Sequence, residues 1–271
     1  MLAERLAQTG NLEGVLAKLQ GEVRESPGDA RLRTFLFQLL SVMGDWERAL
    51  KQLQAAGTMD PAAVPMAHSY RELIRCEVVR AEVFAGRAAP TVLGEPREWV
   101  LSLVKALELT ALGQHEQAES LRQSALEAAP ATLGRADAQS FAWIADADSR
   151  LGPVLEAIVL GRYCWIPFDL IENLTFEAPK DLRDLVWMPG LITLRGQDAQ
   201  VVFVPARYPG TEHQDDAHKL SRKTTWEERG QTTFCGLGQR VFATDTGDLS
   251  LLDLRQLTLQ ASDVTADAAH G

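Results

Sequence analysis

The segment EHQDDAHK, residues 212–219, concentrates side chains that bind metal ions and transfer protons. His213, Asp215 and His218 could serve a metal-dependent hydrolase, which we keep as the alternative function. A metal site needs three or four ligands that converge at about 2.0–2.6 Å from one point. His213 and His218 are five residues apart and diverge on a helix, and on a strand Asp216 and His218 face away from His213. The spacing therefore favours a solvated connection between two strands.

A second candidate for proton transfer is the pair Asp146 and Asp148 in the run DADSR. Paired carboxylates perform acid–base chemistry when their environments separate their pKa values, but an i,i+2 spacing separates the side chains on a helix. The run is also typical of a connection that enters a helix, with Asp148 or Ser149 as N-cap and Pro153 in an early turn. We interpret it as a structural junction between the two halves of the chain, in which a carboxylate holds Arg150. A partner-binding surface is the alternative.

The cysteines and glycines offer little further chemistry. Cys76, Cys164 and Cys235 form no CxxC pair, which favours a reducing compartment and argues against a zinc knuckle. Cys235 has no activating histidine nearby in the sequence, and the GxG of CGLGQR lacks the lysine and hydroxyl residue of a phosphate-binding loop. The sequence therefore predicts neither an enzyme nor a metal or cofactor site.

Composition and net charge limit the classes of molecule that the protein is expected to bind. The 271 residues are 46% hydrophobic and 24% charged, as in soluble globular proteins with a packed core. The net charge of −10, without a basic stripe, disfavours nucleic acids and anionic membranes. The chain starts without a signal-peptide core and contains no apolar run of 18 residues, so we expect a cytoplasmic protein without membrane insertion.

The elements that position these residues begin with a repeat. GNLEGV, GDWERA and GQHEQA start at Gly10, Gly44 and Gly113, and each has a small residue five positions later and a proline twelve after that. Glycine permits a tight turn between two helices, the small residue lets the helices approach, and proline ends the second helix. Gly10 and Gly44 are 34 residues apart, and the pattern resembles the tetratricopeptide repeat. The unit between Gly44 and Gly113 lacks its turn glycine and is predicted as one long helix.

Stacked repeats leave a concave surface that is lined by the first helix of each pair. This predicts the partner-binding residues Thr34, Gln38 and Val42 in one unit and Leu103, Leu107 and Thr110 in another. In the alternative interpretation, the two leucines of this set are simply core.

From Tyr163 onward, the pattern changes to short runs rich in Val, Ile, Phe, Trp and Thr, separated by turn residues. RVFATDTGDLSLLDLR predicts a β-hairpin with Thr246 and Gly247 at the turn. Prolines beside the strands imply edges, bends or a small barrel. The predicted fold is α+β: a tetratricopeptide-like helical-hairpin array over residues 1–135, a mainly β, small barrel-like domain over 136–260, and a disordered tail over 261–271.

Five motifs follow one another in the second half, between about residues 140 and 258. They are WIADADSRLGPVLEAIVLGRYCWIPF, DLRDLVWMP, ARYPGTE, TTWEE and GLGQRVFATDTGDLSLLDLR. Together they resemble the ImpE/TagJ family, accessory proteins of bacterial type VI secretion. The motif positions, structural or at an interface, are Asp146, Asp148, Arg150, Pro153, Glu156, Arg183, Trp187, Arg207, Tyr208, Trp226 and Arg240.

The resemblance implies a cytoplasmic adaptor, not an enzyme, that binds the N-terminal helix of the small subunit of the contractile sheath. It also implies a link to the AAA+ ATPase that recycles the sheath, and hence an influence on sheath assembly. Such recognition places apolar anchors of a partner helix in a groove. A co-chaperone of the ATPase that works through its acidic second half is a further possibility. The histidines of EHQDDAHK are not among the motif positions.

Overall fold

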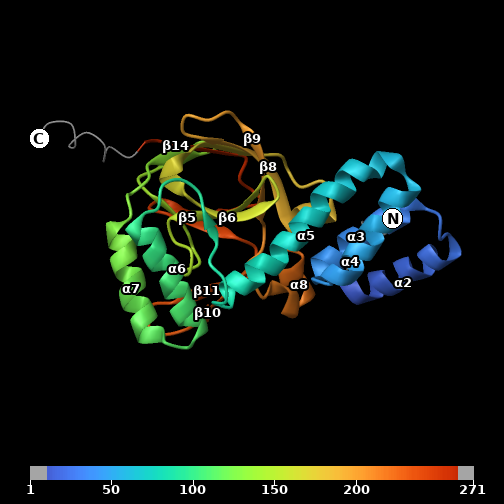
Figure 1. Ribbon diagram of the computed structural model, residues 1–271, viewed down its shortest axis with the longest axis horizontal. Coiled ribbons are helices and arrows are strands. Elements are labelled where there is room, and N and C mark those ends of the chain that lie inside the picture. Colours follow the sequence, from blue (N-terminus) through green and yellow to red (C-terminus); the bar gives the residue numbers. More distant parts are fainter. Residues whose placement is uncertain (1–10, 262–271) are drawn as a thin grey trace, which may run out of the picture.

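The computed structural model describes residues 11–261, with helices first and strands after them (Figure 1). Gly10 of the first repeat and all but one residue of the predicted disordered tail lie outside the described residues. The helices are α2 (Leu12–Glu25), α3 (Ala30–Met43), α4 (Trp46–Met59), α5 (Val64–Phe84), α6 (Glu98–Ala111), α7 (His115–Ala128) and α8 (Asp216–Lys219). Short 3-10 turns are η1 (Pro61–Ala63), η2 (Phe168–Leu170), η3 (Leu182–Leu185) and η4 (Thr211–His213).

The turn glycines mark two helical hairpins, α3–α4 and α6–α7, as the repeat predicts. Gly44 ends α3 in the left-handed conformation with φ of 77°, which glycine adopts without a steric penalty. The small residues Ala49 and Ala118 are fully buried. The long helix predicted for the middle unit is also confirmed, since α5 runs unbroken over 21 residues.

The two hairpins do not stack into one continuous array. Figure 1 shows α2, α3 and α4 at one end of the molecule and α6 and α7 at the other, with α5 running diagonally between them against the strands. The expectation of a single concave surface lined by α3 and α6 is therefore wrong. The physical reason is that α5 packs on the sheet as well as on α4, so it carries the second hairpin away from the first.

The strands of the described chain form three sheets. The largest is a nine-stranded sheet in the order β1-β6-β5-β9-β8-β7-β14-β2-β3, a second sheet has the order β13-β12-β4, and β10 and β11 form a two-stranded ribbon. The β1–β6 pair is parallel and the other pairs in these sheets are antiparallel. The bounds are β1 (Thr91–Val92), β2 (Gly134–Ala136), β3 (Gln139–Phe141), β4 (Ile144–Asp146), β5 (Val154–Val159), β6 (Arg162–Pro167), β7 (Ile171–Phe176), β8 (Trp187–Leu194), β9 (Gln200–Pro205), β10 (Thr224–Glu228), β11 (Phe234–Gly238), β12 (Val241–Thr244), β13 (Gly247–Ser250) and β14 (Gln256–Leu259).

The α+β class is confirmed, but the helical and β parts are not cleanly separated along the sequence. The expected boundary at residue 135 falls inside β2, and β1, which lies between two helices in sequence, pairs with β6. In the described residues the outer strands of the large sheet, β1 and β3, have no second strand partner, so the sheet is open rather than a closed barrel.

Strand β5 of the large sheet is buried on both faces. Val154 and Ile158 of β5 pack with the helices in one core, whereas Leu155, Ala157 and Val159 pack in a second core. Phe242 of the three-stranded sheet belongs to this second core, which also includes residues of the large sheet. Side chains on alternate positions of one strand therefore tie the helices to the two sheets.

Local expectations had mixed outcomes. The hairpin of β12 and β13 is confirmed, and Thr244 pairs with Gly247 across its turn. The helix predicted to follow Asp148 is wrong, because that segment is β5, which is buried on both faces.

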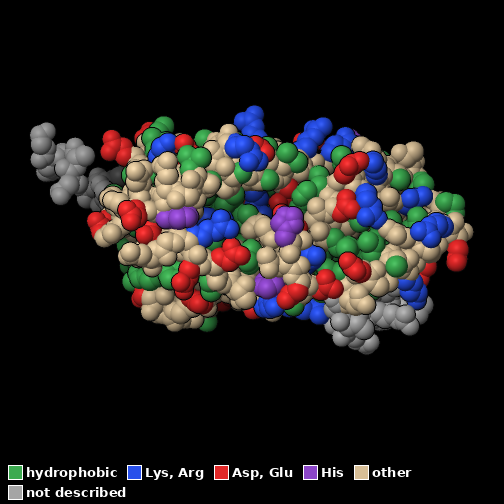
Figure 2. Space-filling model, turned by 90° about the horizontal axis from the view of Figure 1, so that it is seen from below, with side chains coloured by type: hydrophobic (Ala, Val, Ile, Leu, Met, Phe, Trp, Pro, Cys, Tyr) green, Lys and Arg blue, Asp and Glu red, His purple; other side chains and the backbone are tan. Residues whose placement is uncertain are grey.

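No helix within residues 11–261 combines the length and apolarity required to cross a bilayer. Lys and Arg side chains are intermixed with Asp and Glu over the face in Figure 2.

Candidate functional site

A buried ionic network joins helix α5 to the large sheet, and its centre is Glu156 of β5. The Glu156 carboxylate accepts hydrogen bonds from Arg80 Nε at 2.6 Å and Nη2 at 3.0 Å, and from the Tyr163 hydroxyl at 2.6 Å. Arg80 also contacts Glu77 one helical turn away, and Glu77 accepts a 2.8 Å bond from the Trp187 indole. Two charged residues of a helix are thus held inside the protein by strand residues.

Arg240 connects the ionic network to the three-stranded sheet. Its guanidinium donates to both Asp146 and Glu156, and its Nε donates to the Pro205 carbonyl at 2.7 Å. The Tyr208 hydroxyl donates to Asp146 at 3.0 Å, and the Arg240 guanidinium lies 5.2 Å from the Tyr208 ring centre. Arg240, Asp146 and Glu156 are excluded from solvent, so each charge depends on these partners.

Asp148 and Arg150 complete the network. Asp148 accepts from Arg150 Nε at 2.9 Å and Nη2 at 2.5 Å, and from the Gly236 backbone N–H at 2.8 Å. Arg150 stacks 4.9 Å from the ring centre of Phe84, the last residue of α5. The junction predicted for this run is therefore present, with Asp148 as the carboxylate that holds Arg150.

Arg207 fastens the first helical hairpin to the β part. It donates to the carbonyls of Val42 at 2.6 Å and Lys219 at 2.7 Å, and its own carbonyl accepts from Arg80 at 2.7 Å. Burial lowers the pKa of Arg207 to about 10, and Glu77 partly opposes that shift. The carbonyl oxygens at the C-terminus of α3 stabilise its charge, because a cation is favoured there.

The network separates the pKa values of its carboxyl groups. Burial alone would raise the pKa of Glu156, but the guanidiniums of Arg80 and Arg240 outweigh burial and lower it to about 2. Burial raises the pKa of Asp146 to about 6, although Arg240 opposes this shift, and nearby Asp148 adds to it. Separated carboxyl pKa values are also found in catalytic sites. Here both carboxylates are enclosed by protein side chains, so the arrangement favours a structural role.

We predict that Glu156→Gln is less destabilising, relative to the wild type, in acid than at neutral pH. The pKa of Glu156 is lower in the folded protein than its ordinary value of 4.5, so its ionisation stabilises the fold above pH 4.5. That contribution is lost as pH falls through about 2. The difference in free energy of unfolding between the two proteins should narrow by about 3 kcal/mol across this window. Urea titrations at several pH values would measure it, and a difference independent of pH contradicts the prediction.

The segment EHQDDAHK connects β9 to β10, as predicted, but it is only partly exposed to solvent. Asp216 caps α2, because its carboxylate accepts from the Leu12 N–H at 2.9 Å, and His218 is buried. One imidazole nitrogen of His218 lies 3.0 Å from Asp215 and the other 2.9 Å from the Thr225 hydroxyl. His213 points outward, with its side chain 80% exposed.

These contacts leave no shared metal position for the predicted ligands. Within residues 11–261, no group of three or more His, Cys, Asp or Glu side chains is arranged to hold a metal ion. The segment instead packs on the first helical hairpin, where Gly44 approaches Glu212 so closely that a Cβ atom would lie 2.4 Å from the glutamate Cβ.

The six residues predicted for partner binding lie mainly inside the protein. Gln38 and Val42 of α3 are buried, and the Gln38 side chain accepts from the Leu182 N–H of η3 at 3.1 Å. The chain itself therefore covers this face. Thr34 is half-buried beside a shallow hollow. Leu103, Leu107 and Thr110 of α6 are buried, as in the alternative interpretation that made the two leucines core.

The remaining motif positions support this packing. Trp187 is fully buried, and Arg183 stacks 4.6 Å from the Tyr70 ring centre. Pro153 precedes β5, and its carbonyl accepts from Phe168. Trp226 is 40% exposed and lies 5.7 Å from the Tyr208 ring centre. Only Trp226 in this group offers a large apolar surface to solvent.

The cysteines and the GxG run have structural surroundings. Burial raises the pKa of Cys76 to about 11 and of Cys164 to about 12, and it also raises the pKa of Cys235. Thiols with raised pKa values are poor nucleophiles at neutral pH. In CGLGQR, a Cβ atom on Gly236 would lie 2.2 Å from the Tyr208 ring, so this glycine is explained by close packing.

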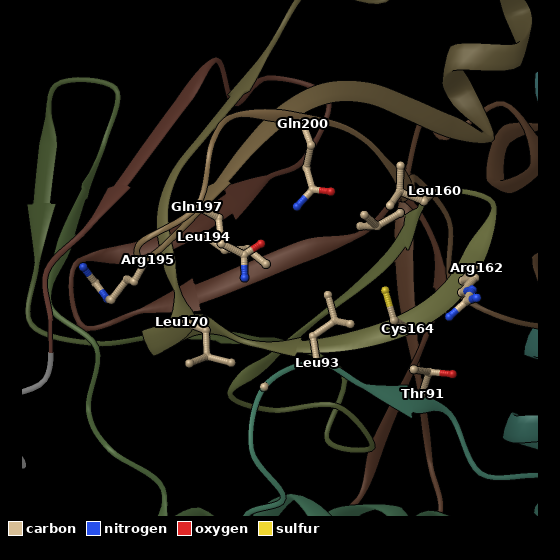
Figure 3. Close-up of a pocket in the computed structure, with 12 residues that line it drawn as sticks. Thr91, Leu93, Leu160, Arg162, Cys164, Leu170, Leu194, Arg195, Gln197 and Gln200 are labelled. Atoms are coloured by element: carbon tan, nitrogen blue, oxygen red, sulfur yellow. The ribbon is translucent and has the colours of Figure 1, made fainter.

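Hollows that are open to solvent lie on the large sheet within residues 11–261. The first, termed here the α5 groove, has a volume of about 360 Å³ between α5 and the strands. It is lined by His68, Ser69, Glu72, Leu73, Ile158, Leu160, Gly161, Val201 and Phe203. The second, termed the rim pocket, has a volume of about 520 Å³ and lies beside β1 and β6 (Figure 3).

Comparison with known proteins agrees with this geometry. The family model described as ImpE protein matches residues 138–258, which include β3 to β13 and most of β14. A curated relative from Pseudomonas aeruginosa, named type VI secretion system accessory component TagJ, is 51% identical over 264 residues. The alignment covers 97% of this chain and 92% of the relative. The chain belongs to the ImpE/TagJ family.

A solved structure extends the likeness beyond the family model. The X-ray crystal structure of a Vibrio parahaemolyticus protein superposes with a TM-score of 0.87 at 28% sequence identity, covering 96% of this chain and 98% of that one. The helical part is thus shared along with the β part. In this ImpE/TagJ chain, the family model contains most of the ionic network but not Glu77 or Arg80, which α5 contributes.

Proposed function

We propose that this chain is a non-enzymatic, cytoplasmic accessory component of a type VI secretion system. In this role it acts as an adaptor that binds the N-terminal helix of the small contractile-sheath subunit. Through that contact it influences sheath assembly or the recycling of the sheath by its AAA+ ATPase. The observation that carries the proposal is the 51% identity, along nearly the whole chain, to a protein named as an accessory component of this system.

The placement of the charged groups supports a binding role. Several residues with strongly shifted pKa values bind one another inside the protein. They include Arg80, Asp146, Glu156 and Arg240. An enzyme presents such groups to a substrate in a pocket. None of these four lines the α5 groove or the rim pocket.

The α5 groove is the surface that we assign to the sheath helix. Ile158 and Phe203 form apolar parts of its wall, and Leu160 and Val201 project into solvent beside them. Leu191 pairs with Val201 across β8 and β9 and extends the exposed apolar surface. A partner helix recognised in this way places a stripe of apolar side chains along the groove. Burial of exposed apolar surface is the main favourable term in such binding.

The test is a titration of this protein with a fluorescent peptide that carries the N-terminal helix of the sheath subunit from the same bacterium. We expect saturable binding, and about ten-fold weaker binding after Val201→Glu, because a carboxylate in an apolar contact must lose its hydration. Fluorescence anisotropy would measure both affinities.

Leu101→Glu is the matched control, since Leu101 of α6 and Val201 are equally exposed at 56% and 55% and only Val201 lines the groove. It should bind the peptide as the wild type does. If the wild type binds no peptide, the proposed partner is wrong. If both variants bind normally, the partner stands and the location is wrong.

A further inference from the structure

The rim pocket combines an apolar wall with cationic ends. Leu93, Leu170, Leu194 and Cys164 contribute apolar atoms or a neutral thiol, and Val159 and Leu160 add to this wall. The polar residues Gln197, Gln200 and Thr91 are also part of the lining. A hollow of about 520 Å³ with a mostly apolar lining and a few polar groups has the character of a small-molecule site.

The charge of this lining is opposite to that of the chain. Arg162 and Arg195 line the pocket, and no Asp or Glu does, although the whole sequence has a net charge of −10. Figure 3 shows the two arginines at opposite ends of the pocket, with the leucines and Cys164 between them. A ligand in this hollow would meet positive charge at its ends and apolar atoms along its middle.

The two arginines differ in their freedom to bind. Arg195 is fixed, because its Nε donates to the Asp169 carbonyl at 2.7 Å and its Nη2 to the Leu259 carbonyl at 3.1 Å. Within the described part of the chain, the Arg162 side chain has no hydrogen-bond or ion-pair partner, and residue 162 is exposed. Its fork of N–H donors is therefore available for a carboxylate, which guanidinium groups bind in a bidentate manner.

We propose that the rim pocket binds a small amphipathic carboxylate, with the carboxylate on Arg162 and the hydrocarbon body against Leu93, Leu170 and Leu194. Apolar burial supplies most of the affinity, and Arg162 selects for the negative charge. The site is separate from the proposed contact with a sheath helix, apart from Leu160, which lines both hollows.

Octanoate is a suitable probe, with octanol and octyltrimethylammonium as neutral and cationic controls of the same chain length. Titrations of the full-length protein, followed by isothermal calorimetry and by amide shifts in NMR spectra, should show preference for octanoate over octanol and over the cation. The shifted amides should belong to β1, β6 and the turn that contains Gln197.

Arg162→Gln should weaken octanoate binding about ten-fold and leave octanol binding unchanged, since it removes only the charged contact. Arg135→Gln is the matched control, because Arg135 is an exposed arginine of β2 that does not line the pocket. Absence of octanoate binding, equal affinity for the three probes, or equal affinity of the wild type and Arg162→Gln would each overturn the proposal. Failure of the sheath peptide to bind this protein would not alter the outcome of the octanoate titrations.

Discussion

Replacement of Arg240 by methionine is expected to lower the free energy of unfolding by about 3–5 kcal/mol. Methionine keeps much of the hydrocarbon stem but removes the guanidinium. Asp146 then loses its ion-pair partner, and Glu156 keeps Arg80 as its cationic partner, inside a region from which solvent is excluded. An uncompensated charge of this kind costs far more than the lost contact alone.

The measurement is denaturant unfolding of the purified protein, followed by tryptophan fluorescence, with the slope and midpoint fitted together. Arg87→Met is the control, because Arg87 forms an exposed ion pair with Glu82. Exposed pairs contribute little to stability, so the control should unfold at nearly the wild-type midpoint. The network has no large role in stability if Arg240→Met unfolds at the same denaturant concentration as Arg87→Met.

The sequence located part of this network and missed the rest. Asp146, Arg150, Glu156 and Arg240 stand within motifs of the ImpE/TagJ resemblance, but nothing in those motifs pairs Arg240 with two carboxylates from different sheets. Glu77 and Arg80 of α5 were not predicted at all. The sequence did contain a signal, because they lie four and seven residues after Leu73, on a helical face that is otherwise apolar. Charged residues on an apolar face indicate buried ion pairs when both signs are present.

The errors at β5 and EHQDDAHK have different physical causes. VLEAIV has no alternation because both faces of β5 are buried, and a short apolar run of this kind does not separate strand from helix. The burial of His218 depends on Thr225 and on the approach of the segment to α2 and Gly44. Local polarity contains no information about such distant contacts.

The predicted groove failed for a related reason. The repeat correctly gives the hairpins α3–α4 and α6–α7, because glycine, alanine and proline act locally on turns and helix ends. Which helical face stays open is decided by the rest of the chain. Here η3 covers Gln38, and α5 separates the two hairpins (Figure 1). A partner surface inferred from repeats alone therefore requires the position of the β part.

Replacement of Gly238 by alanine is expected to destabilise the protein by about 3–4 kcal/mol, through backbone strain and a direct clash. Gly238 has a φ of 92°, and an added Cβ atom would lie 2.0 Å from the Lys223 carbonyl oxygen. Its N–H donates to the Thr211 hydroxyl at 2.9 Å, so movement away from the clash would disturb the β10–β11 ribbon and the segment that contains η4.

Gly196→Ala separates the two causes, because Gly196 has a similar positive φ of 72° with no atom within 4 Å of the added Cβ. It should show only the backbone penalty, about 1 kcal/mol. Thermal and urea unfolding would give both losses, and hydrogen exchange should show faster exchange in β10 and β11 for Gly238→Ala alone. Equal losses in the two variants would mean that φ strain suffices and that the close approach to Lys223 relaxes without cost. A larger loss at Gly238 instead assigns the second glycine of CGLGQR to packing against the backbone at Lys223, which a phosphate-binding loop would leave open for its ligand.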